Sequence, residues 1–197
     1  MELKDSKTRV NLMRAFAGEC QARSRYDMAA SVARKEGHQG IAKVFEYTAK
    51  QELAHAKVFY DFLKASNGEV ITLDTAYPVN SYDTTAEHLG AAKKNEYEEW
   101  EEVYSEFARV AKEEGFDAIA NAFEMISRVE KIHGDRFDKY LNEINNSSLY
   151  KEDTEVQWQC SNCGAIIEGT SAPEICPVCK KKQGYFTKNT CNPVNIQ

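Results

Sequence analysis

Residues 44–59, VFEYTAKQELAHAKVF, form an apolar line typical of one helix face, but an acid and an imidazole interrupt it. Apolar side chains recur here at intervals of three or four residues, the spacing of neighbours on a helix surface. Glu52 and His55 occupy positions on that line where a core would normally place leucine. A buried carboxylate without a partner is very costly. For a single such pair, the simplest interpretation is therefore a satisfied Glu–His hydrogen bond.

The same arrangement recurs in residues 123–137, FEMISRVEKIHGDRF, where Glu130 precedes His133 by three residues. Acids also interrupt the apolar lines of two other predicted helices, as Glu19 in the first and as Glu96 and Glu99 in the third. Each of four predicted helices thus carries an acid on its inward face near mid-length. This repetition favours a shared site over four separate hydrogen bonds.

Start and stop signals divide residues 1–146 into four helices. Asp5 or Ser6 is a candidate cap for the first, and Thr84 with Glu87 forms a capping box for the third. The expected ranges are about 6–36, 41–65, 84–115 and 117–146. Residues 67–83 contain Pro78 and no helical period, so they predict a long crossover between parallel helices.

Two further expectations concern side-chain positions. His38 and His88 fall near helix ends and are expected at the surface. The inward stripe of the third helix is expected to continue without a break beyond its two acids. Its predicted members are Leu89, Ala92, Glu96, Glu99, Val103, Phe107 and Val110.

A Glu on each of two helices, with Glu-x-x-His on each of the other two, is the ligand set of dinuclear sites in ferritin-like bundles. Oxygen and imidazole ligands together favour iron or manganese, and two divalent cations would neutralise the buried acids. Tyr26 and Tyr104 are placed either to donate to a ligand carboxylate or simply to pack. The candidate ligands are Glu19, Glu52, His55, Glu96, Glu99, Glu130 and His133.

The character of the chain changes after Asn146. Residues 147–155 are predicted to form a polar linker. Residues 156–197 are too short to form a stable hydrophobic core without a cross-link such as a bound metal. Two Cys-x-x-Cys pairs, Cys160 with Cys163 and Cys176 with Cys179, supply four thiolates for a tetrahedral site. Such a set holds zinc or iron, and a structural zinc ribbon is one interpretation. A neighbouring redox-capable bundle favours a single iron, because that bundle needs an electron source.

Composition restricts the class of protein. The 197 residues carry a formal net charge of -6, which argues against nucleic acid or an anionic membrane as a partner. No signal sequence and no run of eighteen apolar residues is present, so we expect a cytoplasmic protein with reduced thiols. Of the remaining cysteines, Cys20 is expected to be a small core residue and Cys191 a tail thiol.

These motifs together resemble rubrerythrin, a ferritin-like diiron domain followed by a rubredoxin-like FeS4 domain. The resemblance extends nearly end to end, through AFAGECQARSRY, QELAHAK, Glu96-x-x-Glu99, EKIH and CSNCGAIIEGTSAPEICPVC. It implies that the seven acids and imidazoles bind an oxo- and carboxylate-bridged iron pair and that the four cysteines bind a third iron. It also implies that Tyr26 and Tyr104 bond ligand carboxylates. Lys180 departs from the family, which commonly has a small residue after the fourth cysteine.

The resemblance implies reduction of hydrogen peroxide to water in oxidative-stress defence. Electrons would come ultimately from NAD(P)H through redox proteins such as rubredoxin or an NAD(P)H-dependent reductase. Glu99, an acid beyond the usual ferritin-like set, suggests a ligand that binds only when both irons are ferric. Sixteen residues of helix between Glu130 and Asn146 span roughly 24 Å. A homodimer or tetramer, packed head to tail, would bring a partner's FeS4 domain to the diiron site.

Two other functions remain compatible with the residues. Iron oxidation and storage uses a similar ligand set, although storage needs no attached FeS4 domain to return electrons. The other is a non-catalytic helical module with a zinc ribbon. Visible absorption distinguishes this module from the enzyme, because FeS4 protein is red and zinc protein is colourless.

Overall fold

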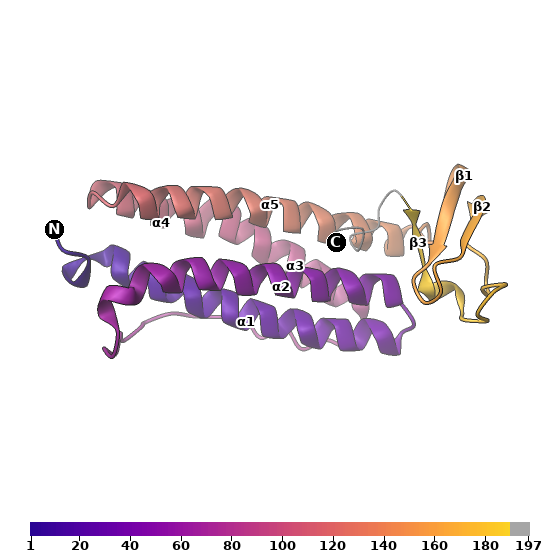
Figure 1. Cartoon of the computed structure of the whole chain (residues 1–197), viewed down its shortest axis with the longest axis horizontal. Helices are drawn as coiled ribbons and strands as arrows, with labels where there is room; N and C mark the ends of the chain where they lie inside the picture. The colour runs from indigo at the N-terminus through magenta and orange to yellow at the C-terminus, as the bar shows by residue number, and fades with distance from the viewer. Residues whose placement is uncertain (190–197) are drawn as a thin grey trace.

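The computed structural model describes residues 1–189, which form a long helical bundle with a small sheet at one end (Figure 1). Short 3₁₀ turns precede the first helix and follow the second, at Leu3–Asp5 and Leu63–Ser66. The mainly helical, ferritin-like architecture predicted from the sequence is confirmed. The bundle helices are α1 (Lys7–Lys35), α2 (Gln39–Phe62), α3 (Thr85–Glu98), α4 (Tyr104–Glu113) and α5 (Asp117–Asn145).

The predicted helix caps are present. The Ser6 hydroxyl accepts from the backbone N–H of Arg9 at 3.1 Å, which satisfies one of the free donors at the start of α1. Thr84 and Glu87 form the expected reciprocal capping box at the start of α3. Gly37 and Gly115 end helices in the left-handed region, with φ of 89° and 85°.

The third predicted helix is not one continuous α-helix. Glu99–Val103 form a π-helical turn between α3 and α4. A π turn inserts one extra residue into the helix, so the inward stripe advances by one position. Tyr104, Ala108 and Ala111 are therefore buried after the turn. The prediction of an unbroken stripe is wrong for this reason: Val103 is 36% exposed and Val110 is only partly buried, although Phe107 still packs against the core.

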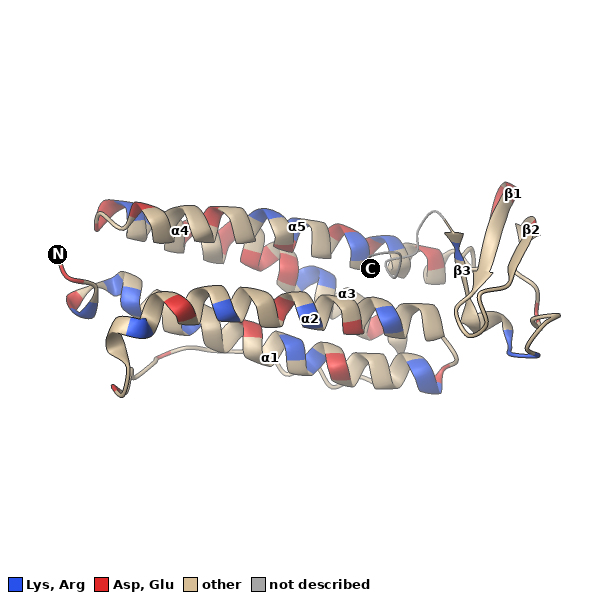
Figure 2. Ribbon diagram, in the orientation of Figure 1, with Lys and Arg blue, Asp and Glu red and all other residues tan. Residues whose placement is uncertain are grey.

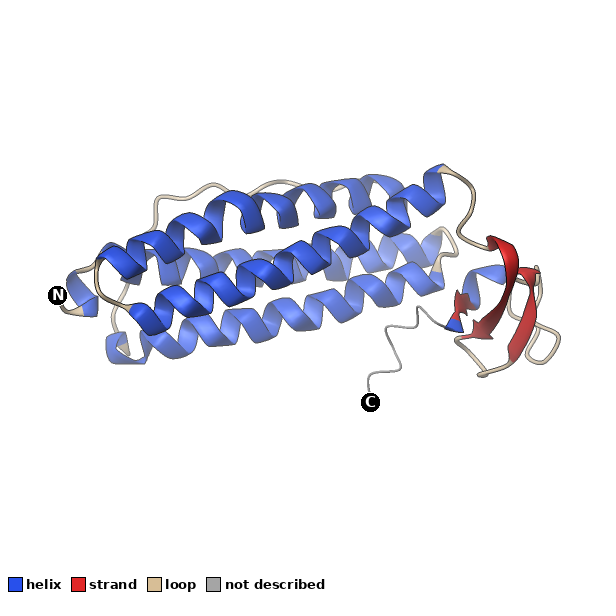
Figure 3. Cartoon of the chain, turned by 90° about the horizontal axis from the view of Figure 1, so that it is seen from above, coloured by secondary structure: helices blue, strands red, loops and turns tan. Residues whose placement is uncertain are grey.

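The segment from residue 67 to 84 contains no helix or strand and connects α2 to α3 along the bundle (Figure 3). Side chains of α1 hold it in place. Arg14 donates to the backbone oxygen of Asp74 at 3.2 Å, and Arg25 donates to the amide oxygen of Asn80. His88 is buried rather than at the surface, because its Nε2 bonds the backbone oxygen of Tyr82 at 3.0 Å where the segment joins α3.

The core consists of two apolar clusters separated along the bundle. One contains Phe45 and Phe137, and the other contains Phe59 and Phe123. Along each helix of the bundle, with α3 and α4 taken as one, the candidate ligands lie between residues of one cluster and residues of the other. The acids and imidazoles therefore form one polar layer with an apolar layer on either side. Figure 2 shows charged residues of both signs distributed along the length of the helices.

The C-terminal sheet has the antiparallel order β2-β1-β3, with β1 (Lys151–Cys160), β2 (Ile166–Ser171) and β3 (Phe186–Lys188). Residues 151–155, expected to belong to a linker, are the first half of β1. The sheet packs on the α1–α2 end of the bundle. A Cβ added at Gly184 would overlap the backbone oxygen of Gly37, so only glycine permits this approach.

A helix both long and apolar enough to cross a membrane is absent from residues 1–189. Cys191 lies outside the described residues.

Candidate metal centres

The polar layer inside the bundle contains two sets of four converging ligand atoms. Within each set, one oxygen or nitrogen atom from each residue lies within 4.8 Å of the others. Glu52 and Glu130 belong to both sets, so these two carboxylates are placed to bridge two cations. The first set adds Glu19 and His55, and the second adds Glu96 and His133.

The ring of His133 is oriented by two residues that the sequence analysis missed. Arg136 donates from Nη1 to Oε1 of Gln51 at 3.0 Å, and His133 Nε2 lies 3.1 Å from the same Gln51 oxygen. Arginine has no acceptor, so this Gln51 atom must be the oxygen, and a neutral His133 carries its proton on Nε2. The Nδ1 lone pair then faces the ligand set. Arg136 lies three residues after His133, and that helical spacing was the available signal.

The geometry around Nδ1 of His133 fits a bound cation. This nitrogen lies 2.9 Å from Oε1 of Glu52 and 2.9 Å from Oε2 of Glu130. A lone pair facing two carboxylate oxygens is repulsive unless a positive charge lies between them. Nδ1 of His55 likewise lies 2.9 Å from Oε1 of Glu130.

Buried polar atoms without hydrogen-bond partners are concentrated in this layer, which is the expected result for atoms that bind metal rather than protein. They belong to all six residues of the two sets: Glu19 Oε2, both oxygens of Glu52, His55 Nδ1, Glu96 Oε2, both oxygens of Glu130, and His133 Nδ1. The residues present therefore fit a dinuclear site.

The electrostatics of the carboxylates point the same way. Burial, with the neighbouring Glu52 charge, raises the pKa of Glu96 to about 8. Burial, together with Glu130 and Glu52, also holds the pKa of Glu19 well above its usual range. The nearby carboxylates raise the pKa of His133 and outweigh the effect of its burial. Two divalent cations would offset the burial of these carboxylates and the repulsion among them, because cations stabilise the ionised carboxylates directly.

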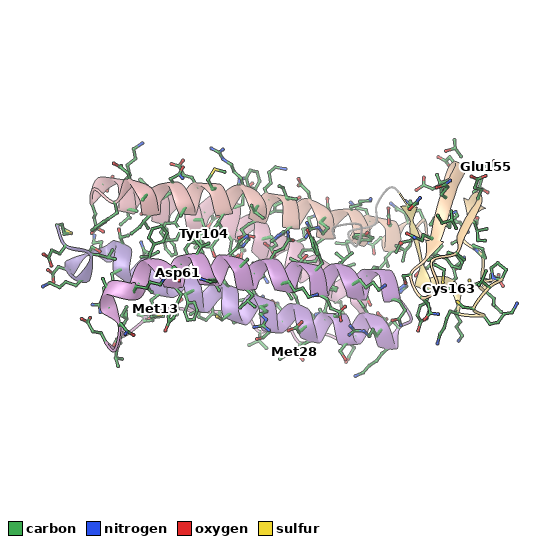
Figure 4. All side chains as sticks on the ribbon, in the orientation of Figure 1. Met13, Met28, Asp61, Tyr104, Glu155 and Cys163 are labelled. Carbon is green, nitrogen blue, oxygen red and sulfur yellow. The ribbon has the colours of Figure 1, made fainter. Side chains whose placement is uncertain are left out.

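Two tyrosine hydroxyls donate hydrogen bonds to ligand carboxylates of the polar layer. One tyrosine belongs to each of the two apolar clusters that flank this layer. The Tyr26 hydroxyl donates to Oε1 of Glu96, and the Tyr104 hydroxyl donates to Oε1 of Glu19. Figure 4 shows Tyr104 inside the bundle, between α4 and the α1–α2 pair. The π turn is what directs Tyr104 inward, five residues beyond Glu99. Each tyrosine fixes one oxygen of a ligand carboxylate and leaves the other for the centre.

Glu99 differs from the other predicted ligands, because it belongs to neither set of four. Its side chain is half-buried on the π turn, whereas Glu19, Glu52, Glu96 and Glu130 are buried. Burial and the nearby Glu96 carboxylate raise the pKa of Glu99 well above its usual range. Cys20 is partly exposed rather than a core residue, and it is in neither set.

The second centre is formed by four free cysteines at the tips of two turns beside the sheet, with Cys163 labelled in Figure 4. The sulfur atoms of Cys160 and Cys179 are 3.6 Å apart, and those of Cys163 and Cys176 are 3.7 Å apart. A tetrahedral site with metal–sulfur bonds of about 2.3 Å has edges of about 3.8 Å, whereas a disulfide would need about 2.05 Å.

The two cysteine turns are built alike. The residue after each second cysteine, Gly164 or Lys180, has a left-handed backbone, with φ of 77° and 62° respectively. Lys180 thus holds a conformation that favours glycine, which explains why a small residue suits this position. The backbone N–H of Lys181 lowers the pKa of the Cys179 thiol to about 6, which favours the thiolate that a metal binds.

Comparisons with known proteins agree with both centres. The family model described as rubrerythrin matches residues 11–141, and the model of the rubrerythrin rubredoxin-like domain matches residues 158–187. The chain is 46% identical to a rubrerythrin of Clostridium perfringens, over 93% of this chain and 95% of the relative. It is 45% identical to a rubrerythrin of Porphyromonas gingivalis, over 93% and 90%.

A solved structure of nigerythrin in its fully reduced, all-ferrous state is 30% identical. The superposed region covers 93% of this chain and 90% of the nigerythrin chain, with a TM-score of 0.63. The ligand sets, the four cysteines and these matches lead to one conclusion. The chain belongs to the rubrerythrin family, with a carboxylate- and histidine-ligated diiron site in the bundle and a four-cysteine site for one iron beside it.

Proposed function

We propose that this protein reduces hydrogen peroxide to water at the diiron site. Rubrerythrins are known for peroxidase activity in oxidative stress. When bound, two ferrous ions supply together the two electrons that convert one H₂O₂ and two protons into two waters. The observation that carries the proposal is the pair of ligand sets that share Glu52 and Glu130, because these two carboxylates would hold two irons close enough for both to give an electron to one peroxide.

The residues around the site suit this reaction. The carboxylates of both sets are buried, so water has little access to the reacting atoms from most directions. The hydroxyl groups of Tyr26 and Tyr104 hold Glu96 and Glu19 in place as the charge of the centre changes. Anaerobic single-turnover mixing of the all-ferrous protein with one equivalent of hydrogen peroxide tests the proposal. Full oxidation of the diiron site with no release of free iron is the expected outcome.

We further propose that the cysteine-bound iron returns electrons to the diiron site, with NAD(P)H as the ultimate source through rubredoxin or an NAD(P)H-dependent reductase. We propose that this route runs between the two subunits of a homodimer. Within one chain the sheet is fixed at the end of the bundle, where Gly184 lies against Gly37 and Lys43 donates to the backbone oxygen of Ser161 at 3.2 Å. The diiron layer lies near mid-length of the bundle, away from the sheet. We propose that a head-to-tail partner brings its four-cysteine iron closer to this diiron site than the chain's own four-cysteine iron.

Mixed dimers test this electron route. Cys160→Ser removes a ligand of the single iron, and Glu52→Ala removes a bridge of the diiron site. Each homodimer is expected to lack NADH-driven turnover, whereas mixed dimers regain a large part of it. If mixing restores nothing, although light scattering shows exchanged subunits, electrons do not pass between subunits.

Iron oxidation and storage is the alternative function. The attached four-cysteine domain favours the peroxidase, since storage needs no internal return of electrons. A hollow multisubunit shell that accumulates ferric mineral would support the alternative.

A further inference from the structure

A cavity of about 200 Å³ reaches from the surface to the diiron layer beneath the segment that connects α2 to α3. This volume holds several water-sized molecules. The inner wall includes Glu99 and Tyr104, and the roof is formed by residues 75–78. Tyr104 donates to Glu19, a member of the first ligand set, so the cavity ends one hydrogen bond from the centre.

Exposure at the centre is uneven in a way that matches this cavity. The carboxylates of both ligand sets are at most 1% exposed. Glu99, which lines the cavity, is the half-buried acid beside them. His55 is 9% exposed, but it does not line this cavity. Solvent therefore approaches the centre on two sides, at His55 and, through this cavity, at Glu99.

Tyr77 covers the cavity as part of its roof. Its hydroxyl donates to the backbone oxygen of Arg14 at 3.0 Å, which anchors the ring to α1. Its Cε1 lies 3.8 Å from the position that a Cβ on Gly18 would occupy. The absent side chain at Gly18 thus leaves the space beneath the ring open.

Two residues that line the cavity, Arg25 and Asn95, hold one end of the connecting segment. Arg25 and Asn95 both donate to Oδ1 of Asn80, the latter at 2.9 Å, which fixes the roof at its far end.

We propose that this cavity is the entrance by which a small hydroperoxide reaches the diiron site, with Tyr77 restricting its width. The proposal rests on the proposed peroxidase function and adds to it the path and the size selection. Hydrogen peroxide passes beneath the Tyr77 ring along Gly18. Bulkier organic hydroperoxides are excluded by the ring.

Narrowing the cavity gives the first test. Gly18→Leu fills the space beneath Tyr77 from a fixed helix position, and Ala17→Leu adds the same side chain on the same helix outside the cavity. Two rates are measured by stopped-flow absorbance: azide binding to the oxidised protein, and oxidation of the ferrous protein by hydrogen peroxide. Gly18→Leu is expected to slow both about tenfold, equivalent to about 1.4 kcal/mol of activation free energy. Ala17→Leu is expected to leave both within twofold.

Widening the cavity gives a second test that does not depend on the first variant folding. Tyr77→Ala removes the roof ring, and Tyr82→Ala removes a tyrosine of similar exposure from the same segment, 38% against 40%. Tyr77→Ala is expected to raise the rate with tert-butyl hydroperoxide, relative to hydrogen peroxide, about tenfold. Tyr82→Ala is expected to leave this ratio unchanged.

The outcomes separate the two proposals. If Gly18→Leu retains its iron and both rates stay within twofold of the unmodified protein, entry is elsewhere and the proposal is wrong. An unchanged peroxide ratio in Tyr77→Ala would refute the size selection. If the unmodified protein shows no reaction with hydrogen peroxide but Gly18→Leu still slows azide binding, the peroxidase proposal fails while the entrance stands.

Discussion

Arg136 Nη1 lies 3.0 Å from Gln51 Oε1, the oxygen that also faces Nε2 of His133. The guanidinium lies 5.2 Å from the centre of the Tyr47 ring and also donates to the Thr48 hydroxyl at 2.8 Å. These contacts fix the guanidinium, which fixes the amide and thereby the histidine tautomer. A residue outside the ligand sets thus determines which nitrogen of His133 is available to iron.

Replacing Arg136 with methionine is expected to weaken iron binding at the diiron site by about 10–100-fold, because the Gln51 amide and the His133 ring lose their fixed orientation. Competition with a chelator measures the affinity. Arg128→Met, on the exposed side of the same helix, is the matched control and is expected to change little. Equal iron affinities in the two variants would contradict the tautomer argument.

Tyr26→Phe is expected to lower the reduction potential of the diiron site by roughly 60 mV, a tenfold change in the one-electron equilibrium. Without the Tyr26 donor, Glu96 gives more negative charge to the centre and stabilises the ferric state. Spectroelectrochemical titration measures the potential. Tyr97→Phe is the control, because that hydroxyl donates to Asp135 at 2.9 Å rather than to a ligand. A similar shift in both variants would exclude a specific role for Tyr26.

Glu99→Gln tests whether Glu99 binds iron only in the ferric state. Loss of a carboxylate ligand from the ferric state alone is expected to raise the potential by roughly 60 mV and to leave ferrous iron affinity unchanged. Glu102→Gln, an exposed acid on the same π turn, is the control. Structures of the reduced and oxidised protein add a direct check, and identical iron–Glu99 distances in both would refute the hypothesis.

The junction between bundle and sheet is expected to weaken in mild acid because of His38. Its Nδ1 lies 3.3 Å from the Tyr150 hydroxyl, and burial lowers its pKa below the usual 6.5. The folded state therefore takes up fewer protons than the unfolded state just below pH 6.5. The free energy of unfolding is expected to fall as the pH drops from 6.5 through the lower folded pKa.

His38→Gln removes this titration, so its stability is expected to change less between pH 7.5 and pH 5.5. Thermal unfolding of the iron-loaded protein at both values measures the effect. Protonation of Glu36 also lowers the free energy of unfolding, but only at a more acidic pH. Burial raises the pKa of this carboxyl, but hydrogen bonds from Thr85 outweigh burial and hold the pKa below 4.5. Identical pH dependence in the variant and the unmodified protein would exclude His38 as the cause.

The sequence by itself determined the chemistry and the local order of this protein. Glu52 with His55 and Glu130 with His133 are three residues apart, and helical geometry alone places each pair on one face. The Thr84–Glu87 capping box and the two Cys-x-x-Cys turns are likewise short-range features, which explains why they could be predicted.

The tertiary structure decided everything that depends on contacts between distant segments. It selected Glu52 and Glu130 as the shared carboxylates, left Glu99 outside both sets, and brought Arg136 to Gln51. It also made the π turn, whose extra residue moves Tyr104 inward, and it laid Tyr77 across Gly18. Periodicity describes one helix at a time, whereas these features arise from how four helices and a connecting segment pack around a common layer of charge.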